Sequence, residues 1–301
     1  MRLLTRSGFG GLVCGALLRE VGVVDNYKFV HPKDIQDRRV DVTGQDVIAG
    51  LPYAPGCKMW FDRRTEDYSG SSDVCEGENR LAPSTARVIY DYYSGKADLS
   101  HFEEMMHFVD KWDSGNLTKD EILNPTGWIM LAFVMDPRTG LGRFHNFRIS
   151  NYELMEVLME SCRTMSIDEI LVMPDLRERV SLYTEQAGMF KRMLEKHSYT
   201  EGNVVVTDLR HADVIFVGNR FVIYTMFKKQ TFSIWIINSK DEKNCSIAVG
   251  HNILNRKSDI HIGELLLAYG GGGRRYTGTC QVSTSEADSV IASLIKKMKT
   301  V

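Results

Sequence analysis

The residues near the start of the chain that are best suited to chemistry are the glycines of TRSGFGG, which follow the apolar segment MRLL. Gly8 and Gly10 form the first half of a G-x-G-x-x-G pattern, in which backbone N–H groups at a helix N-terminus bind the pyrophosphate of a dinucleotide. Val13 replaces the third glycine, and no acidic residue ends a well-placed second strand to bind a ribose. The stretch is therefore a weak match to a dinucleotide site, and its role stays open at this point.

A second glycine run, Gly270 to Gly273, follows the helical segment GELLLAY, with Arg274, Arg275 and Thr279 beyond it. Glycine lets backbone N–H groups approach a phosphate closely, and arginine adds bidentate hydrogen bonds. This pattern can bind phosphate without a metal. The alternative is that the glycines only end a helix and make a tight turn, with the arginines in solvent.

The composition is that of an ordinary soluble protein: 301 residues, 43% hydrophobic, 25% charged and a net charge of −2. The charge excludes binding of nucleic acid by bulk positive charge. No apolar run reaches the ~20 residues that span a bilayer, and we see no signal-peptide pattern. The cysteines form no CxxC pair and the histidines are dispersed, which argues against a zinc site and favours reduced thiols in the cytoplasm.

The first half of the chain alternates apolar runs with helical patterns, which predicts crossover units and a parallel sheet. We expect strands at 1–5, 27–32, 46–53 and 58–62, and helices at 11–22, 82–95 and 100–113.

In residues 149–197 the apolar residues have an almost wholly helical spacing. After residue 197 the sequence changes to β-rich runs. These runs are 203–209, 213–219, 220–227, 232–238 and 245–250, followed by helices at 261–273 and 285–299. We therefore predict an α/β protein with an N-terminal parallel-sheet domain (1–148), a helical connector (149–197) and a smaller C-terminal α/β domain with a mixed sheet (198–301).

Four landmarks taken together resemble one family: TRSGFGG, WFDRR at 60–64, KWDSGNL at 111–117 and YGGGGRRYTGTC at 269–280. In order and spacing they look like the DHH phosphoesterases with a C-terminal DHHA1 domain. That family includes oligoribonucleases, RecJ-type exonucleases and the exopolyphosphatase-like branch, which the chain resembles most. The resemblance covers nearly the whole chain and implies a DHH-like domain over 1–148 and a substrate-binding DHHA1-like domain over 198–301.

Such proteins bind two manganese or magnesium ions through a D-x-D motif, a D-H-H motif and a further aspartate, because hard cations prefer carboxylate oxygens. This chain has Gly8 and Gly10 in place of the first two aspartates, and Asp62, Arg63 and Arg64 in place of D-H-H. Arginine has no lone pair to offer a metal and stays protonated. Asp62 is retained, so the positions at which the family's catalytic motifs are degenerate are Gly8, Gly10, Arg63 and Arg64.

The resemblance leaves only Asp62 and Asp113 as residual metal ligands, and two carboxylates are too few for a dinuclear centre. Either residue has a plain structural alternative, because Asp62 can cap the segment after its strand and Asp113 can make a turn before Ser114 and Gly115. We therefore expect no metal cofactor.

The phosphate-binding half of the family pattern is better preserved. Candidates for ligand binding, from the family positions and the glycine run, are His251, Arg256, Gly271, Gly272, Gly273, Arg274, Arg275 and Thr279. The partner they imply is a short oligonucleotide or another phosphorylated ligand such as polyphosphate, bound in the cleft between the two domains.

The leading hypothesis is accordingly a catalytically inactive member of the family that still binds a phosphorylated ligand. One alternative is an active metal-dependent phosphodiesterase with a rearranged site built from Asp62, Asp113 and Asp110. The other is a structural or assembly protein that reuses the fold. We expect a cytoplasmic homo-oligomer that does not enter a membrane.

Overall fold

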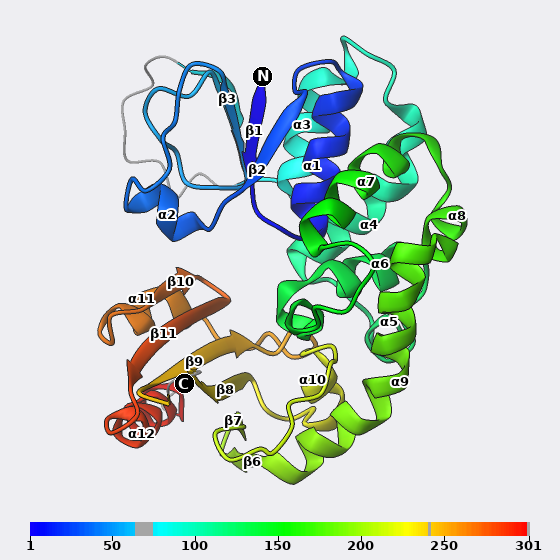
Figure 1. The fold of residues 1–301 in the computed structure, drawn as a ribbon. Coiled ribbons are helices and arrows are strands. Elements are labelled where there is room, and N and C mark those ends of the chain that lie inside the picture. The colour runs from blue at the N-terminus through cyan, green and yellow to red at the C-terminus, as the bar shows by residue number, and fades with distance from the viewer. Residues whose placement is uncertain (64–74, 240–241, 300–301) are drawn as a thin grey trace. The chain divides into compact units, whose positions relative to one another are not determined.

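The computed structural model describes the chain in three stretches, residues 1–63, 75–239 and 242–299 (Figure 1). The chain divides into two compact units. Unit 1 is Met1–Asn116 with Pro125–Leu182, and unit 2 is Leu117–Asn124 with Tyr183–Val301. No helix in the described stretches is long and apolar enough to cross a membrane.

Unit 1 is built on sheet A, five parallel strands in the order β2-β1-β3-β4-β5. The strands are β1 (Arg2–Thr5), β2 (Asn26–Phe29), β3 (Asp46–Ala49), β4 (Met59–Asp62) and β5 (Glu76–Asn79). Every residue of β3 and β4 is buried, as expected for central parallel strands that are covered on both faces. The edge strand β5 has the polar sequence EGEN and is partly exposed.

The helices of unit 1 pack around sheet A and against one another, and α1 contacts α3, α4, α6 and α7 (Figure 1). Their bounds are α1 (Phe9–Glu20), α2 (Pro32–Gln36), α3 (Thr85–Ser94), α4 (Glu103–Ser114), α6 (Gly127–Met135), α7 (Asn151–Thr164) and α8 (Ile167–Val172). Three 3₁₀ turns join them: η1 (Ser100–Phe102), η2 (Pro137–Thr139) and η3 (Leu141–Arg143). Capping boxes from Ser150 with Glu153 and from Ser166 with Glu169 fix where α7 and α8 begin.

Unit 2 is built on sheet B, a mixed sheet in the order β10-β11-β9-β8-β7-β6, in which only the pair β7–β8 is parallel. The strands are β6 (Ser198–Glu201), β7 (Val204–Asp208), β8 (Phe232–Asn238), β9 (Asn244–His251), β10 (Gly272–Arg274) and β11 (Thr277–Ser283).

Helices cover both faces of sheet B. The helices α11 (Ile262–Leu267) and α12 (Ala287–Lys299) share a core with Val204 and Val206 of β7. On the other face, α10 (Val222–Met226) and the second half of α9 (Pro174–His197) pack on Val205 and Trp235. The short α5 (Lys119–Leu123) also belongs to this unit, and Asn219 Nδ2 donates to its Ile122 carbonyl (3.1 Å). Strand residues alternate between the two cores, which is the period-2 pattern of a covered sheet.

The predicted fold class is confirmed: an α/β protein with a parallel N-terminal sheet, a helical connector and a mixed C-terminal sheet. Two of the predicted β-rich runs are wrong. Residues 220–227 contain the helix α10, because a short apolar run has no periodicity that separates a buried helix from a buried strand. Residues 213–219 form no strand, since Val217 N–H donates to Gln186 Oε1 (2.7 Å) instead of joining a ladder.

Candidate functional site

The candidate site in unit 1 lies at the edge of sheet A where its parallel strands end. The first strand, β1, ends at Thr5 and leads into Gly8, while β4 ends at Asp62 and leads into Arg63. Loops at the carboxyl edge of a parallel sheet are where ligands bind in open α/β folds. The topology therefore brings together two segments that the sequence separates by more than fifty residues.

Gly10 and Asp113 are direct neighbours at this edge. A Cβ placed on Gly10 would lie 3.0 Å from each carboxylate oxygen of Asp113, which is the last-turn aspartate of α4. Gly8 is the N-cap of α1 and has φ +125, a conformation that L side chains rarely adopt. The first motif therefore faces a carboxylate, as the family resemblance implies, but itself provides no side-chain oxygen at these two positions.

Asp62 and Arg63 are held by short hydrogen bonds. Asp62 is 1% exposed, and its Oδ1 accepts from the backbone N–H of Arg63 (2.6 Å). The Arg63 guanidinium donates to two main-chain carbonyls, those of Asp113 (2.8 Å) and Pro83 (2.9 Å). Arg63 thus connects β4, the start of α3 and the end of α4. Arg64, the other arginine of this motif, lies outside the described residues.

A guanidinium and a carboxylate that sequence reasoning missed also belong to this neighbourhood. Desolvation lowers the pKa of Arg6, and Arg138 lowers it further, while Asp113, Asp136 and Asp62 act in the opposite direction. Asp136 is itself held by Arg138, whose guanidinium contacts both carboxylate oxygens (2.6–3.0 Å). In the sequence, the signal that could have found Asp136 is its position at the end of a buried apolar helix, directly before Pro137.

Asp110, which we considered as a third metal ligand, is committed elsewhere. Its Oδ1 accepts from Ser84 Oγ (2.6 Å), and its Oδ2 accepts from Arg87 Nε (2.9 Å). Because Ser84 is also the N-cap of α3, this pair fixes α3 against α4. Asp110 is thus a structural anchor in this conformation.

The carboxylates at this edge do not converge as a dinuclear metal site requires. Over residues 1–63, 75–239 and 242–299, no three or more histidine, cysteine, aspartate or glutamate side chains are grouped so that they could hold an ion. Two ions need bridging and terminal carboxylates to offset their charge. Asp62 and Asp113 alone do not fit two ions.

The candidate ligand-binding residues of unit 2 are gathered around the hairpin β10–β11, with His251 at the end of β9 next to it. His251 is 3% exposed, its Nε2 donates to the Ile260 carbonyl (2.9 Å), and burial lowers its pKa. Its ring lies edge-on to Tyr276, which in turn is covered by the guanidinium of Arg256 (5.4 Å). His251 is therefore a neutral, buried support of the hairpin, whereas Arg256 is exposed.

The arginines and threonine of the hairpin differ in their surroundings. Arg274 ends β10, and Arg275 pairs with the fully exposed Asp259 (3.1 Å). Thr279 lies opposite Gly272 in the ladder and is exposed. An anion can displace an exposed carboxylate such as Asp259 at little cost.

The glycine run serves packing at some positions and leaves space at others. A Cβ on Gly271 would lie 2.5 Å from Cys280 Cβ, and one on Gly273 would lie 2.3 Å from Gly278 Cα. A Cβ on Gly272 would meet nothing within 4 Å. Close approach of the chain to itself thus accounts for Gly271 and Gly273, and Gly272 is the member that packing does not require.

This difference gives a matched pair of variants. We expect Gly271→Ala to lower the free energy of unfolding by about 1–3 kcal/mol through overpacking, and Gly272→Ala to change it by less than about 1 kcal/mol. Urea unfolding measures both. If the backbone at Gly272 binds phosphate, Gly272→Ala weakens binding of a phosphorylated ligand without loss of stability. If Gly272→Ala binds the phosphorylated ligand with unchanged affinity, the glycine run serves only the packing of the chain.

No protein-family profile and no curated protein sequence matches the chain, so comparison depends on solved structures. The chain is similar to PggH of Vibrio cholerae, a pGpG-specific phosphodiesterase, with 41% identity, 99% of each chain covered and a TM-score of 0.82. It shares its fold with an exopolyphosphatase-related protein of Bacteroides fragilis (13% identity, 99% of this chain and 92% of that one, TM-score 0.52). It also shares its fold with the exonuclease RecJ bound to manganese (11% identity, 99% and 90% covered, TM-score 0.51).

The parallel sheet of unit 1, the mixed sheet of unit 2 and the strand-end site of unit 1 define a two-unit protein of the α/β class. With 41% identity over 99% of both chains, the protein belongs to the DHH/DHHA1 phosphoesterase family, as the landmarks predicted.

The expectation that this chain has no metal cofactor is wrong. The chain belongs to the DHH/DHHA1 phosphoesterase family, and RecJ, which has the same fold, was solved bound to manganese. The sequence argument counted side chains only at the motif positions. Asp136 is not a ligand that this count overlooked, because Arg138 contacts both of its carboxylate oxygens (2.6–3.0 Å). The comparisons also give no support to the expectation that the protein is inactive. Self-association and a cytoplasmic location stay predictions.

Proposed function

We propose that this protein is a metal-dependent phosphodiesterase that hydrolyses a short 5′-phosphorylated dinucleotide of the pGpG type. The observation that carries the proposal is the 41% identity, over 99% of both chains, with a pGpG-specific phosphodiesterase. An identity of this extent covers both the strand-end site of unit 1 and the hairpin of unit 2.

The two units supply different parts of the chemistry. Unit 1 supplies carboxylates at the carboxyl edge of sheet A, with Asp62 and Asp113 as the candidates to hold a divalent ion. Unit 2 supplies the half-buried backbone at Gly272, where an added Cβ would meet nothing within 4 Å, and the exposed guanidinium of Arg256, and both suit a phosphate. Because the described carboxylates do not fit two ions, we assign them no catalytic step.

The direct test is hydrolysis of pGpG in the presence of manganese, with Asp113→Asn as the informative variant. We expect turnover by the wild-type protein and a loss of about tenfold or more in kcat/KM for Asp113→Asn, because a ligand carboxylate contributes to binding of the ion. Asparagine keeps the shape of the side chain, so the fold should be retained. Product formation is followed by chromatography.

The matched control is Asp120→Asn in the exposed first turn of α5, which we expect to hydrolyse pGpG like the wild type. Chelation of divalent ions should abolish turnover in all three proteins. The proposal is contradicted if the wild-type protein shows no turnover in manganese, or if turnover continues unchanged in chelator.

A second candidate function is binding of the same ligand with little or no turnover. The observation that favours it is the set of residues at the motif positions, Gly8, Gly10 and Arg63, beside only two candidate ligands. It predicts saturable binding of pGpG in equilibrium dialysis together with no hydrolysis under conditions in which an active relative turns over. A structural or assembly role has no observation of its own in its favour.

A further inference from the structure

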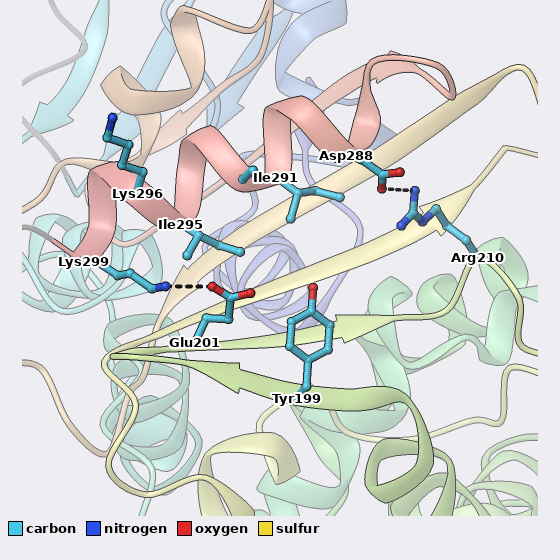
Figure 2. A pocket seen from close by; sticks show the side chains of 9 residues that line it. Tyr199, Glu201, Arg210, Asp288, Ile291, Ile295, Lys296 and Lys299 are labelled. Atoms are coloured by element: carbon cyan, nitrogen blue, oxygen red, sulfur yellow. Dashed lines mark hydrogen bonds and ion pairs between the residues drawn. The ribbon is translucent and has the colours of Figure 1, made fainter.

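Each sheet of the protein has a short polar edge strand, β5 in sheet A and β6 in sheet B. In unit 2, β6 is joined to α12 by the ion pair of Glu201 with Lys299 (2.7 Å), beside a pocket of about 500 Å³ (Figure 2). In unit 1, Glu76 at the start of β5 pairs with Lys58, directly before β4 (2.5 Å). Both partners of the unit 1 pair are exposed, and exposed ion pairs are weak. This pair therefore adds little to what holds the start of β5.

Two cysteines lie directly next to the ion pair of unit 1. Cys57 precedes Lys58, Cys75 precedes Glu76, and both cysteines are free thiols. The backbone N–H of Glu76 donates to the Lys58 carbonyl (3.0 Å), so the parallel ladder of β4 and β5 reaches the residues beside the cysteines. With strands about 4.8 Å apart and a rise of about 3.3 Å per residue, an offset of one residue places the two cysteine Cα atoms about 6 Å apart. Disulfides have Cα separations of about 4.4–6.8 Å, so this backbone admits one.

The two thiols share one apolar environment. Cys57 is 5% exposed in the core cluster around Trp60, and Cys75 packs against the same cluster but is only partly buried. Burial raises the pKa of the Cys57 thiol to about 12, and the charge and the hydrogen bond of the neighbouring Cys75 add to this shift. Cys57 is therefore a protonated thiol in contact with Cys75, and Cys75 is the member of the pair that a reagent in solvent reaches.

A second pair of cysteines, in unit 2, shows why the offset matters. Cys245 of β9 and Cys280 of β11 lie on adjacent strands and in one core. Cys280 is opposite Ile247, two residues away from Cys245, so the two cysteines are diagonal neighbours. Diagonal neighbours are about 7–8 Å apart, and beyond about 7 Å a disulfide requires movement of the backbone. The unit 2 pair is therefore an internal comparison for the unit 1 pair.

We propose that Cys57 and Cys75 form a reversible disulfide that ties the edge strand β5 to β4. The oxidant is a low-molecular-weight disulfide. The Cys75 thiolate attacks one of its sulfur atoms, which breaks its S–S bond, forms a mixed disulfide and releases one thiolate. Cys57 then loses its proton and attacks Cys75 Sγ, which forms the protein disulfide and releases the second thiolate. The two protons lost by the cysteines are taken up by the two released thiolates.

The disulfide would act on stability and not on the candidate site. It joins the amino ends of β4 and β5, whereas Asp62 is at the carboxyl end of β4. Three steps of about 3.3 Å from Met59 to Asp62 separate the two ends by about 10 Å. A disulfide stabilises a protein mainly by constraining the unfolded chain. The inference does not depend on the proposed hydrolytic function.

The test is incubation of the folded protein with oxidised glutathione, followed by alkylation of the free thiols, digestion and mass spectrometry. We expect a linked peptide that contains Cys57 and Cys75, and a dithiol reductant should reverse the link. The melting temperature of the oxidised protein should exceed that of the reduced protein by about 5 °C or more. Cys57→Ser should stop the reaction at the mixed disulfide of Cys75 with glutathione.

Cys280→Ser is the matched control, because it leaves Cys57 and Cys75 in place, and it should form the linked peptide like the wild type. Cys75→Ser should form no such peptide and show no rise in melting temperature. The proposal is overturned if neither thiol of the wild-type pair reacts, or if Cys75 keeps glutathione while Cys57 stays open to alkylation, because the two sulfur atoms then do not meet. A link between Cys245 and Cys280 in its place also overturns it, because oxidation would then follow movement of the backbone.

Discussion

Replacing Gly10 by aspartate should raise manganese-dependent hydrolysis of pGpG by about a hundredfold. The new carboxylate starts from a Cβ that lies 3.0 Å from both oxygens of Asp113, so the two side chains can share one ion. Gly10 is the second residue of α1, where the helix dipole also favours a negative charge. A metal site supplies several kcal/mol of transition-state stabilisation, and about 2.7 kcal/mol corresponds to a hundredfold.

The same variant should be less stable than the wild type in chelator and more strongly stabilised by manganese. Two carboxylates this close repel each other, and Asp113 must move by a few tenths of an ångström to admit the new Cβ. A bound ion reverses the repulsion and adds binding free energy to folding. The melting temperature, measured with and without manganese, therefore reports the ion without any assay of activity.

Gly44→Asp is the matched control for this experiment. It makes the same chemical change in an exposed turn before β3, at the opposite edge of sheet A, where an added Cβ meets nothing within 4 Å. It should alter neither hydrolysis nor the response to manganese. A Gly10→Asp protein that folds but gains neither activity nor a manganese-dependent shift would show that Gly10 does not face an ion site.

The fold could be read from the sequence where burial and periodicity agree. The central strands β3 and β4 are continuous apolar runs between turn residues, and they occur where the sequence predicts them. Edge strands carry no such signal. Strand β5 is EGEN and strand β6 is SYTE, both largely polar, and only pairing with a neighbour makes them strands.

The site could be predicted in part, because the family landmarks mark the ends of strands. They located Asp62 and Asp113, which the fold brings to the same edge of sheet A. They could not show that Asp110 is tied to Arg87 or that Asp136 acts on Arg6, since both facts depend on how helices pack. Counting carboxylates along the sequence therefore could not tell which of them are already held by arginines, as Asp110 and Asp136 are.

Replacing Arg179 by methionine should lower the free energy of unfolding of unit 1 by about 3–5 kcal/mol, because removal of a buried, fully hydrogen-bonded charge leaves its partners unsatisfied. Arg179 is 1% exposed on α9. Its guanidinium donates to the carbonyls of Ile149 (2.6 Å) and Asp175 (2.7 Å), to Asn151 Oδ1 (3.0 Å) and to Glu178 Oε1 (2.9 Å). These bonds fix the segment that enters α7 against the start of α9.

The stacked ring of Phe147, 4.2 Å from the Arg179 guanidinium, also loses its partner in this variant. At about 2–4 °C per kcal/mol for a unit of this size, thermal unfolding should shift downwards by about 6–20 °C. Arg177→Met on the same helix is the control, because Arg177 is exposed and should change stability by no more than about 0.5 kcal/mol. Arg179→Lys should fall between the two, since lysine keeps the charge but cannot reach all four acceptors in the geometry of a planar fork. Equal melting temperatures for Arg179→Met and Arg177→Met would mean that the buried guanidinium gains no more from its partners than it loses by leaving water.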